Sequence, residues 1–101
     1  MRVIVFFDLP VLADNEKRDY RQFRKMLIKN GFIMQQKSVY SKLALNNTVA
    51  EAIKDTIRRN KPKSGLIEML VITELQYNKI EYILGENEDY VEDSTNRLIV
   101  L

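Results

Sequence analysis

The order of its strand-like and helix-like segments is the feature that most constrains the fold of this chain. Runs of β-branched and aromatic residues predict strands at 2–7, 32–36, 38–43 and 66–73. Amphipathic patterns predict one helix between the first two strands and another between the last two. The resulting order, βαββαβ, is that of the split βαβ or ferredoxin-like arrangement. The sequence therefore predicts an α+β fold built on a four-stranded sheet.

Local signals predict where the helices begin and end. Asp14 or Asn15 can cap the first helix, and Gly31 can end it in a left-handed conformation. Thr48-x-x-Glu51 is a capping-box pattern for the second helix, and Thr73-x-x-Gln76 predicts a short helical turn after the last strand. The expected apolar faces are Tyr20, Phe23, Met26 and Leu27 on the first helix, and Val49, Ala52, Ile53 and Ile57 on the second.

A chain of 101 residues, with 46% apolar and 30% charged residues, has the size and composition of one folded domain. We expect a single ferredoxin-like domain at 1–101, with its core at 1–80. Residues 81–101 are then a C-terminal extension for dimer or partner contacts. Two short strands are expected in this extension, at 82–84 and 98–101, separated by an acidic loop at 86–93.

The strands at 3–7 and 66–72 are apolar on both of their alternating faces. Two helices can cover only one face of a four-stranded sheet, and monomers rarely expose an apolar patch as large as the other. The sequence therefore predicts a symmetric homodimer, in which a second copy of the sheet covers this face.

The chain contains no cysteine and no histidine. This excludes thiol nucleophiles, disulfides, Cys/His zinc sites and Ser-His-Asp triads. Catalysis is left to carboxylates, Tyr, Lys, Arg or a metal held through oxygen. The apolar run at 3–7 ends at Asp8, too early for a signal peptide or a membrane span. We therefore expect a cytoplasmic protein with no membrane partner.

Charge is divided unevenly along the chain, although its net value is only +2. Residues 1–63 hold 14 basic and 6 acidic side chains, whereas residues 64–101 hold 2 and 8. This separation predicts a basic surface that binds a polyanion, with an unevenly charged solvated surface as the alternative. The expected nucleic-acid-binding residues are Lys17, Arg18, Arg21, Lys25, Lys37, Ser38, Arg58 and Arg59, and Lys29, Lys61 and Lys63 belong to the same clusters.

Asp8 is the candidate residue for chemistry, because it follows the apolar first strand at the point where side chains leave the core. One carboxylate alone is a poor Mg²⁺ site, since this ion usually takes one or two carboxylates with waters and phosphate oxygens. Two copies of Asp8 facing each other across a dimer axis could share Mg²⁺ and direct water at a phosphodiester. The alternative is an ordinary turn residue before Leu9 and Pro10.

The chain ends in an apolar strand-like segment whose backbone groups need a pairing partner. Strand addition to the sheet edge of another protein supplies one, and the alternative is pairing with 82–84 in the same dimer. The expected partner-binding residues are Arg97, Leu98, Ile99, Val100 and Leu101.

Four stretches together resemble the small CRISPR-associated endoribonuclease family of the spacer-acquisition complex. They are Phe7-Asp8-Leu9-Pro10, Arg21-x-Phe23-Arg24-Lys25-x-Leu27, Asn30-Gly31-Phe32 and Gln36-Lys37-Ser38-Val39-Tyr40. The resemblance implies a ferredoxin-like homodimer, with Asp8 as catalytic residue and Mg²⁺ ligand. It further implies a subunit that bridges two dimers of the CRISPR integrase and does not need its nuclease activity for that role.

We therefore expect an adaptation subunit that holds duplex DNA on its basic surface and docks the integrase through its acidic and C-terminal segment. Single-stranded RNA is a further expected ligand. Two rival functions stay open: a stand-alone, toxin-like metal-dependent ribonuclease, and a non-catalytic RNA-binding module. An integrase gene and a repeat array beside the gene for this chain would exclude both rivals.

Overall fold

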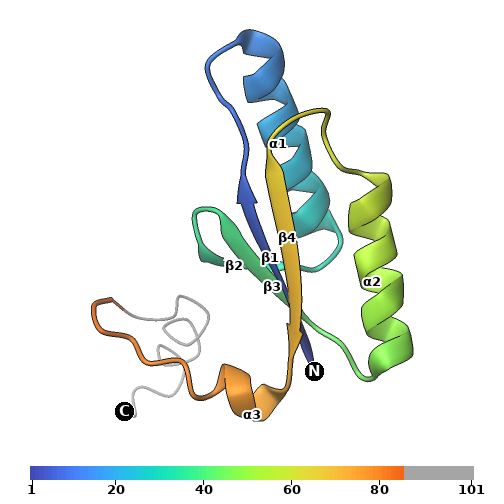
Figure 1. The fold of residues 1–101 in the computed structure, drawn as a ribbon, viewed down its shortest axis with the longest axis vertical. Helices are drawn as coiled ribbons and strands as arrows, with labels where there is room; N and C mark the ends of the chain where they lie inside the picture. Colours follow the sequence, from blue (N-terminus) through green and yellow to red (C-terminus); the bar gives the residue numbers. More distant parts are fainter. Residues whose placement is uncertain (86–101) are drawn as a thin grey trace.

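The computed structural model describes residues 1–85, which form one antiparallel sheet with helices packed on it (Figure 1). The strand order across the sheet is β2-β3-β1-β4. This order and the βαββαβ sequence of elements confirm the predicted α+β, ferredoxin-like fold. The elements are β1 (Arg2–Asp8), α1 (Asp14–Lys29), β2 (Ile33–Gln36), β3 (Val39–Leu43), α2 (Asn47–Arg59), β4 (Leu66–Ile72) and α3 (Glu74–Tyr77).

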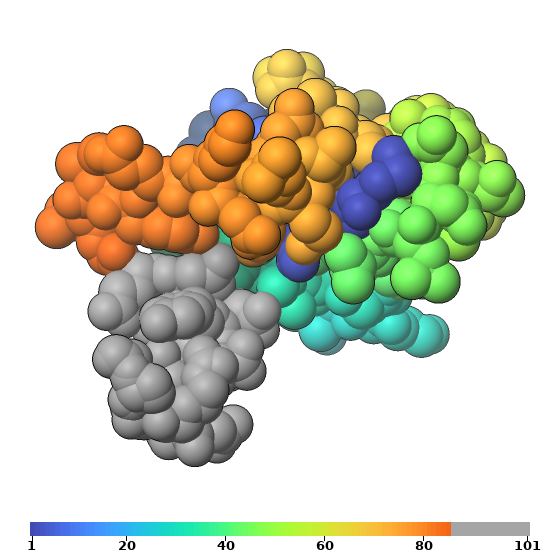
Figure 2. Space-filling view, turned by 90° about the horizontal axis from the view of Figure 1, so that it is seen from below, coloured from blue at the N-terminus to red at the C-terminus, as the bar shows by residue number. Residues whose placement is uncertain are grey.

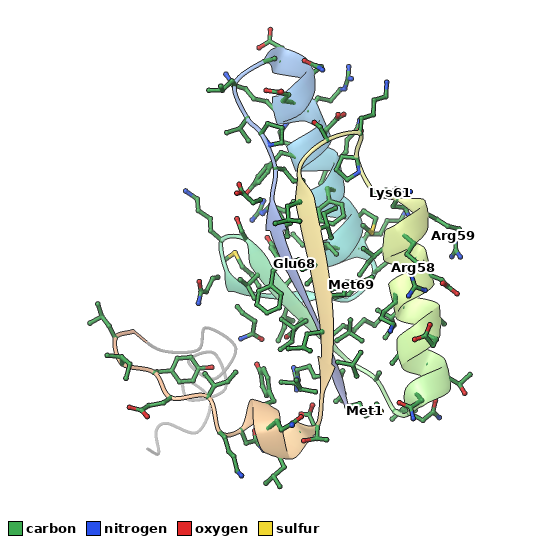
Figure 3. The ribbon with its side chains drawn as sticks, viewed as in Figure 1. Met1, Arg58, Arg59, Lys61, Glu68 and Met69 are labelled. Atoms are coloured by element: carbon green, nitrogen blue, oxygen red, sulfur yellow. The ribbon has the colours of Figure 1, made fainter. Side chains whose placement is uncertain are left out.

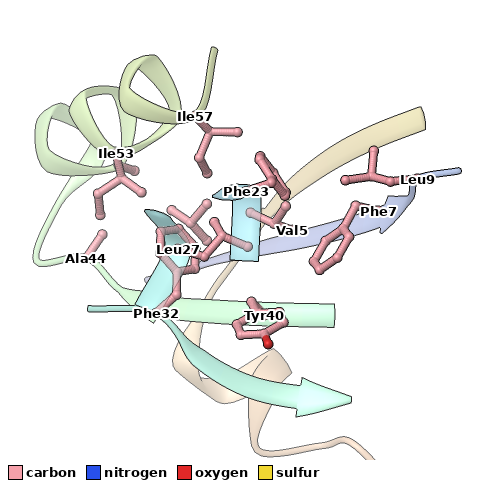
Figure 4. Close-up of a cluster of buried hydrophobic side chains, with 12 residues drawn as sticks. Val5, Phe7, Leu9, Phe23, Leu27, Phe32, Tyr40, Ala44, Ile53 and Ile57 are labelled. Carbon is pink, nitrogen blue, oxygen red and sulfur yellow. The ribbon is translucent and has the colours of Figure 1, made fainter. Parts of the chain in front are cut away.

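β1 is a central strand that pairs antiparallel with both β3 and β4. Because side chains alternate along a strand, Val3, Val5 and Phe7 share one face of the sheet, and all three are buried. α1 and α2 lie on this face (Figure 1). The core forms between these layers. There the rings of Phe7 and Phe23 of α1 pack edge-on, with their centroids 5.2 Å apart (Figure 4).

The apolar face predicted for α1 is confirmed, since Phe23 and Leu27 are buried. The prediction for α2 was wrong at one position. Ala50 packs in the core with Ile53 and Ile57, whereas Ala52 is exposed. Ala50 lies three and seven residues before these two side chains, which is the spacing of one helix face.

The N-terminal cap predicted for α1 was wrong. The residue that precedes the helix is Ala13, so Asp14 and Asn15 already belong to its first turn. The Glu16 carboxylate supplies the cap instead, accepting hydrogen bonds from the backbone N–H of Ala13 at 2.9 Å and of Leu12 at 3.1 Å. A side chain three residues inside the helix thus takes the role expected of the preceding residue.

The cap predicted for α2 was also wrong, whereas the one for α3 is confirmed. Asn46 precedes α2, and its Oδ1 accepts the N–H of Val49 at 2.9 Å, so Thr48 is already helical. An extended Asn is among the best N-terminal caps, which explains the earlier start. At α3, Thr73 and Gln76 form the reciprocal capping box.

The second face of the sheet is only partly covered. It carries Phe6, Leu66 and Leu70, whose side chains remain 36, 56 and 51% exposed. The exposed apolar side chains expected from the sequence are therefore present on this face, where Glu68 lies between Leu66 and Leu70 and is also exposed. We call it the open face.

The segment after α3 differs from the prediction, because residues 82–84 form no strand. A strand needs a neighbouring strand for its hydrogen bonds, and the described part of the chain contains only the four-stranded sheet. Ile83 and Leu84 are 82 and 94% exposed instead, and Figure 2 shows the segment up to Gly85 projecting at one side of the molecule. The second expected strand, at 98–101, lies outside the described residues.

We expect Gly65→Ala to lower the free energy of unfolding by about 2–4 kcal/mol. Gly65 has φ +109°, and a Cβ there would lie 2.6 Å from Leu9 Cδ2 and 2.9 Å from the Asp8 carbonyl oxygen. Gly85→Ala is the matched control, because Gly85 also has positive φ but a Cβ there meets no atom within 4 Å. Urea unfolding of the two variants compares them, and equal losses would contradict a clash at Gly65.

Candidate nucleic-acid interface and metal site

Asp8 is the last residue of β1, on the same side of that strand as Phe6 and therefore at the rim of the open face. It lies opposite Leu66 of β4, and it is exposed. Within residues 1–85 it forms no ion pair. The structure thus presents a carboxylate to solvent at the end of a central strand, as a ligand for a cation requires.

The turn between β2 and β3 lies beside Asp8. The Phe7 N–H donates to the Ser38 carbonyl at 3.0 Å, which fixes Lys37 and Ser38 next to the end of β1. Lys37 is exposed and Ser38 is half-buried. The structure therefore brings together three of the predicted site residues, one acidic, one basic and one hydroxylic.

The described residues contain no group of three or more Asp or Glu side chains that could hold a metal ion. Glu68 is the nearest acidic position along the sheet. It lies opposite Phe6 on β4, one diagonal step from Asp8 on the same face, and Figure 3 shows it on the side of β4 away from Met69. A single exposed Asp suits Mg²⁺, which takes most of its ligands from water and phosphate oxygens.

The cations predicted on α1 are all exposed. Lys17, Arg21, Lys25 and Lys29 form no ion pair within residues 1–85, whereas Arg18 lies 3.8 Å from the Asp19 carboxylate. The unpaired side chains keep their full charge available to an anion.

Arg24 has a structural role that the sequence did not reveal. Its Nε donates to the buried hydroxyl of Tyr40 at 2.7 Å. This bond and its burial make Tyr40 a core residue. Its position in an apolar strand was the available signal.

The cations at the end of α2 fall into two kinds. Arg58 forms ion pairs with Asp55 and Glu51, and its hydrogen bond to Asp55 raises the pKa of the Arg58 guanidinium above its ordinary value. Arg59, Lys61 and Lys63 are exposed and form no ion pair within the described chain. Figure 3 shows Arg58, Arg59 and Lys61 gathered at this end of α2. Of the predicted pair, Arg59 is thus the one whose charge is uncompensated.

A groove separates α1 from the end of α2. It consists of two hollows of about 480 and 280 Å³, which share Gln22, Met26 and Asn60. Lys25 and Lys29 line the larger hollow, and Lys61 and Lys63 line the smaller one. Sequence reasoning placed these lysines in separate clusters and did not bring them to one groove.

A network of polar side chains holds α3 against the open face. The Arg2 guanidinium makes two hydrogen bonds to the Glu74 carboxylate, at 2.9 and 3.1 Å, and lies 4.0 Å from the centroid of the Tyr77 ring. The Tyr77 hydroxyl donates to Gln35 Oε1, which also accepts from Ser41. The Arg2 hydrogen bond lowers the pKa of Glu74 below its ordinary value of 4.5. The capping box predicted α3, but nothing local indicated where it docks.

We expect Glu74→Gln to lower the free energy of unfolding by about 0.5–1 kcal/mol at neutral pH, a small value because the pair is partly exposed. A carboxylate with a lowered pKa contributes stability above its unfolded pKa, here near 4.5, and loses it as pH falls through the folded value. Urea unfolding should therefore separate wild type and variant at neutral pH, and the two should converge in acid. Glu81→Gln is the control, and a difference that persists in acid would contradict this reasoning.

Two further expectations concern membrane contact and the C-terminal residues. No helix within residues 1–85 has the length and apolarity to cross a membrane. Residues 97–101, predicted to bind a partner, lie outside the described residues.

Comparison with known proteins identifies the family of this chain. A family model described as CRISPR associated protein Cas2 matches residues 1–80. The chain belongs to the Cas2 family. This confirms the resemblance drawn from the sequence.

Cas2 relatives match the chain over its whole length. The CRISPR-associated endoribonuclease Cas2 of Treponema denticola is 55% identical over 101 residues and is covered completely. The protein of the same name from Streptococcus mutans serotype c is 44% identical, with all of this chain and 93% of that protein covered. The solved Streptococcus pyogenes Cas2 at pH 6.5 matches 84% of this chain and 100% of its own, with a TM-score of 0.63 and 19% identity. That likeness supports the Cas2 fold.

Proposed function

We propose that this chain is a Cas2 subunit of CRISPR adaptation that acts in the cytoplasm as a homodimer, binds duplex DNA and bridges dimers of the integrase. The observation that carries the proposal is the set of exposed cations on α1, Lys17, Arg21, Lys25 and Lys29, which form no ion pair within residues 1–85 of a chain of the Cas2 family. Exposed cations that are not held by carboxylates of the described chain are suited to phosphates.

The open face supports a dimer. Phe6, Leu66 and Leu70 are exposed on it, and a second copy covers them while leaving α1 and α2 in solvent, because the helices lie on the opposite side of the sheet (Figure 1). An interface of this kind is isologous, so each apolar residue is used twice.

Endoribonuclease activity is the second part of the proposal, since the relatives in Treponema denticola and Streptococcus mutans are named for it. Asp8 would hold Mg²⁺ and is the proposed catalytic residue, with single-stranded RNA as a substrate. Bound Mg²⁺ supplies charge neutralisation at a phosphodiester and a more acidic water. Lys37 beside Asp8 would bind the substrate phosphate, and the exposed rim of the sheet would leave room for a single strand of RNA.

The C-terminal extension at 81–101 is the proposed integrase contact, through Arg97 to Leu101. These residues are apolar except for Arg97, and they follow the acidic stretch 86–93. Strand addition would satisfy their backbone groups.

Assembly of three components tests the proposal. Wild-type protein is expected to recover both the neighbouring integrase and a labelled duplex in one pull-down. Deleting residues 96–101 should lose the integrase and keep the duplex, whereas Arg21→Ala with Lys25→Ala should weaken duplex recovery and keep the integrase. Circular dichroism confirms that each variant is folded. If the wild type recovers neither component but cleaves RNA, the result favours the rival function of a stand-alone ribonuclease. The exposed Asp8 would then be its metal ligand.

A further inference from the structure

The groove between α1 and the end of α2 gathers lysines from two parts of the chain. Lys25 and Lys29 line one of its hollows, and Lys61 and Lys63 line the other. All four are exposed, and none forms an ion pair within residues 1–85. Four like charges around one concave surface attract a polyanion.

Acidic side chains are arranged so that they do not offset this charge. Asp19 is the acidic residue in the lining, and it lies 3.8 Å from Arg18. The carboxylates of α2, Glu51 and Asp55, are paired with Lys54 and Arg58 and do not line the groove. The potential of the groove is therefore positive, although α2 as a whole carries both signs.

The cations of α1 lead into this groove. Lys17, Arg21, Lys25 and Lys29 recur every four residues, so successive members rise about 6 Å along the helix and turn by about 40°. The row therefore winds around α1 and reaches the groove at Lys25 and Lys29, which line the larger hollow. Its step is comparable with the spacing of successive phosphates along one strand.

We propose that one strand of a nucleic-acid duplex binds with its sugar–phosphate backbone in the α1–α2 groove. The backbone would lie between Lys25 and Lys29 of α1 on one side and Lys61 and Lys63, which follow α2, on the other. This rests on the proposed duplex binding and adds the path of the backbone. The Gln22 amide, which is exposed and shared by both hollows, supplies a neutral donor at the middle. No exposed aromatic side chain lines the described groove, so the contact is to phosphates and does not read sequence.

The absence of cysteine allows a direct test, because any introduced cysteine is the only thiol in the chain. Gln22→Cys places a photo-crosslinking maleimide inside the groove, and Thr48→Cys places it on the exposed first turn of α2, outside the groove. With a labelled DNA duplex, the Gln22→Cys protein is expected to crosslink several-fold more than the Thr48→Cys protein. Equal or lower crosslinking at Gln22→Cys overturns the proposal.

Charge reversal gives a second, independent test. Lys29→Glu with Lys61→Glu should weaken duplex affinity about tenfold at low salt, with a shallower slope of log affinity against log salt. Lys54→Glu with Lys79→Glu changes the net charge equally outside the groove and should weaken binding much less. Equal weakening by both pairs overturns the groove as the backbone path, leaving only a general charge effect.

These outcomes separate the inference from the function on which it rests. If the wild type binds no duplex even at low salt, the proposed function fails. If the wild type binds and the groove pair behaves like the control pair, only the backbone path fails. Circular dichroism and light scattering confirm that each variant keeps its fold and its state of association.

Discussion

Asp8→Asn is expected to reduce metal-dependent RNA cleavage by about 10²–10⁴-fold, since it preserves the shape of the side chain but removes the charge that holds Mg²⁺. Asp8 is exposed and forms no ion pair within the described chain. The substitution should therefore leave unfolding by urea nearly unchanged. Duplex binding and integrase recovery should also persist, because both are assigned to other surfaces.

Asp14→Asn is the matched control, as Asp14 is also an exposed carboxylate but lies in the first turn of α1 instead of in β1. Two quantities are measured for both variants: the rate of RNA cleavage, and the binding of Mn²⁺, which is detected by its paramagnetic signal. Cleavage by Asp8→Asn at the wild-type rate would show that hydrolysis occurs elsewhere or comes from a contaminant. Loss of fold in this variant would mean that Asp8 is a structural residue.

Leu70→Asp is expected to weaken the dimer by at least about 100-fold, because a two-fold interface contains the substitution twice and buries a charge each time. Leu70 is 51% exposed on the open face, opposite Ile4 of β1 and one diagonal step from Phe6. Ile28→Asp is the control, because Ile28 is 50% exposed but lies on α1, on the other side of the sheet. Light scattering over a range of concentrations gives the mass of each variant.

Wild type and Ile28→Asp should have the mass of a dimer at micromolar concentration, and Leu70→Asp that of a monomer. A monomeric wild type would contradict the dimer. Equal dissociation of both variants would contradict the open face as the interface.

The part of the site that could be predicted is the part that depends on neighbours in sequence. Asp8 at the end of β1 and the exposed cations of α1 follow from strand and helix periodicity, which assign a side chain to the core or to solvent. Whether a cation is available to an anion was not predictable in this way. Arg58 and Arg59 are adjacent in sequence, yet within residues 1–85 two carboxylates hold Arg58 and none holds Arg59.

The sequence by itself determined the type and order of the elements from β1 to α3, because each run of apolar residues has a period of a strand or a helix and Gly31 ends α1 with φ +88°. The Thr73–Gln76 box likewise determined α3 through bonds between near neighbours. Only the tertiary structure decided the groove between α1 and α2 and the anchoring of α3 by Arg2 and Glu74. The partners in these contacts are up to 72 residues apart, and their distances are set by how helices and strands pack rather than by any local pattern.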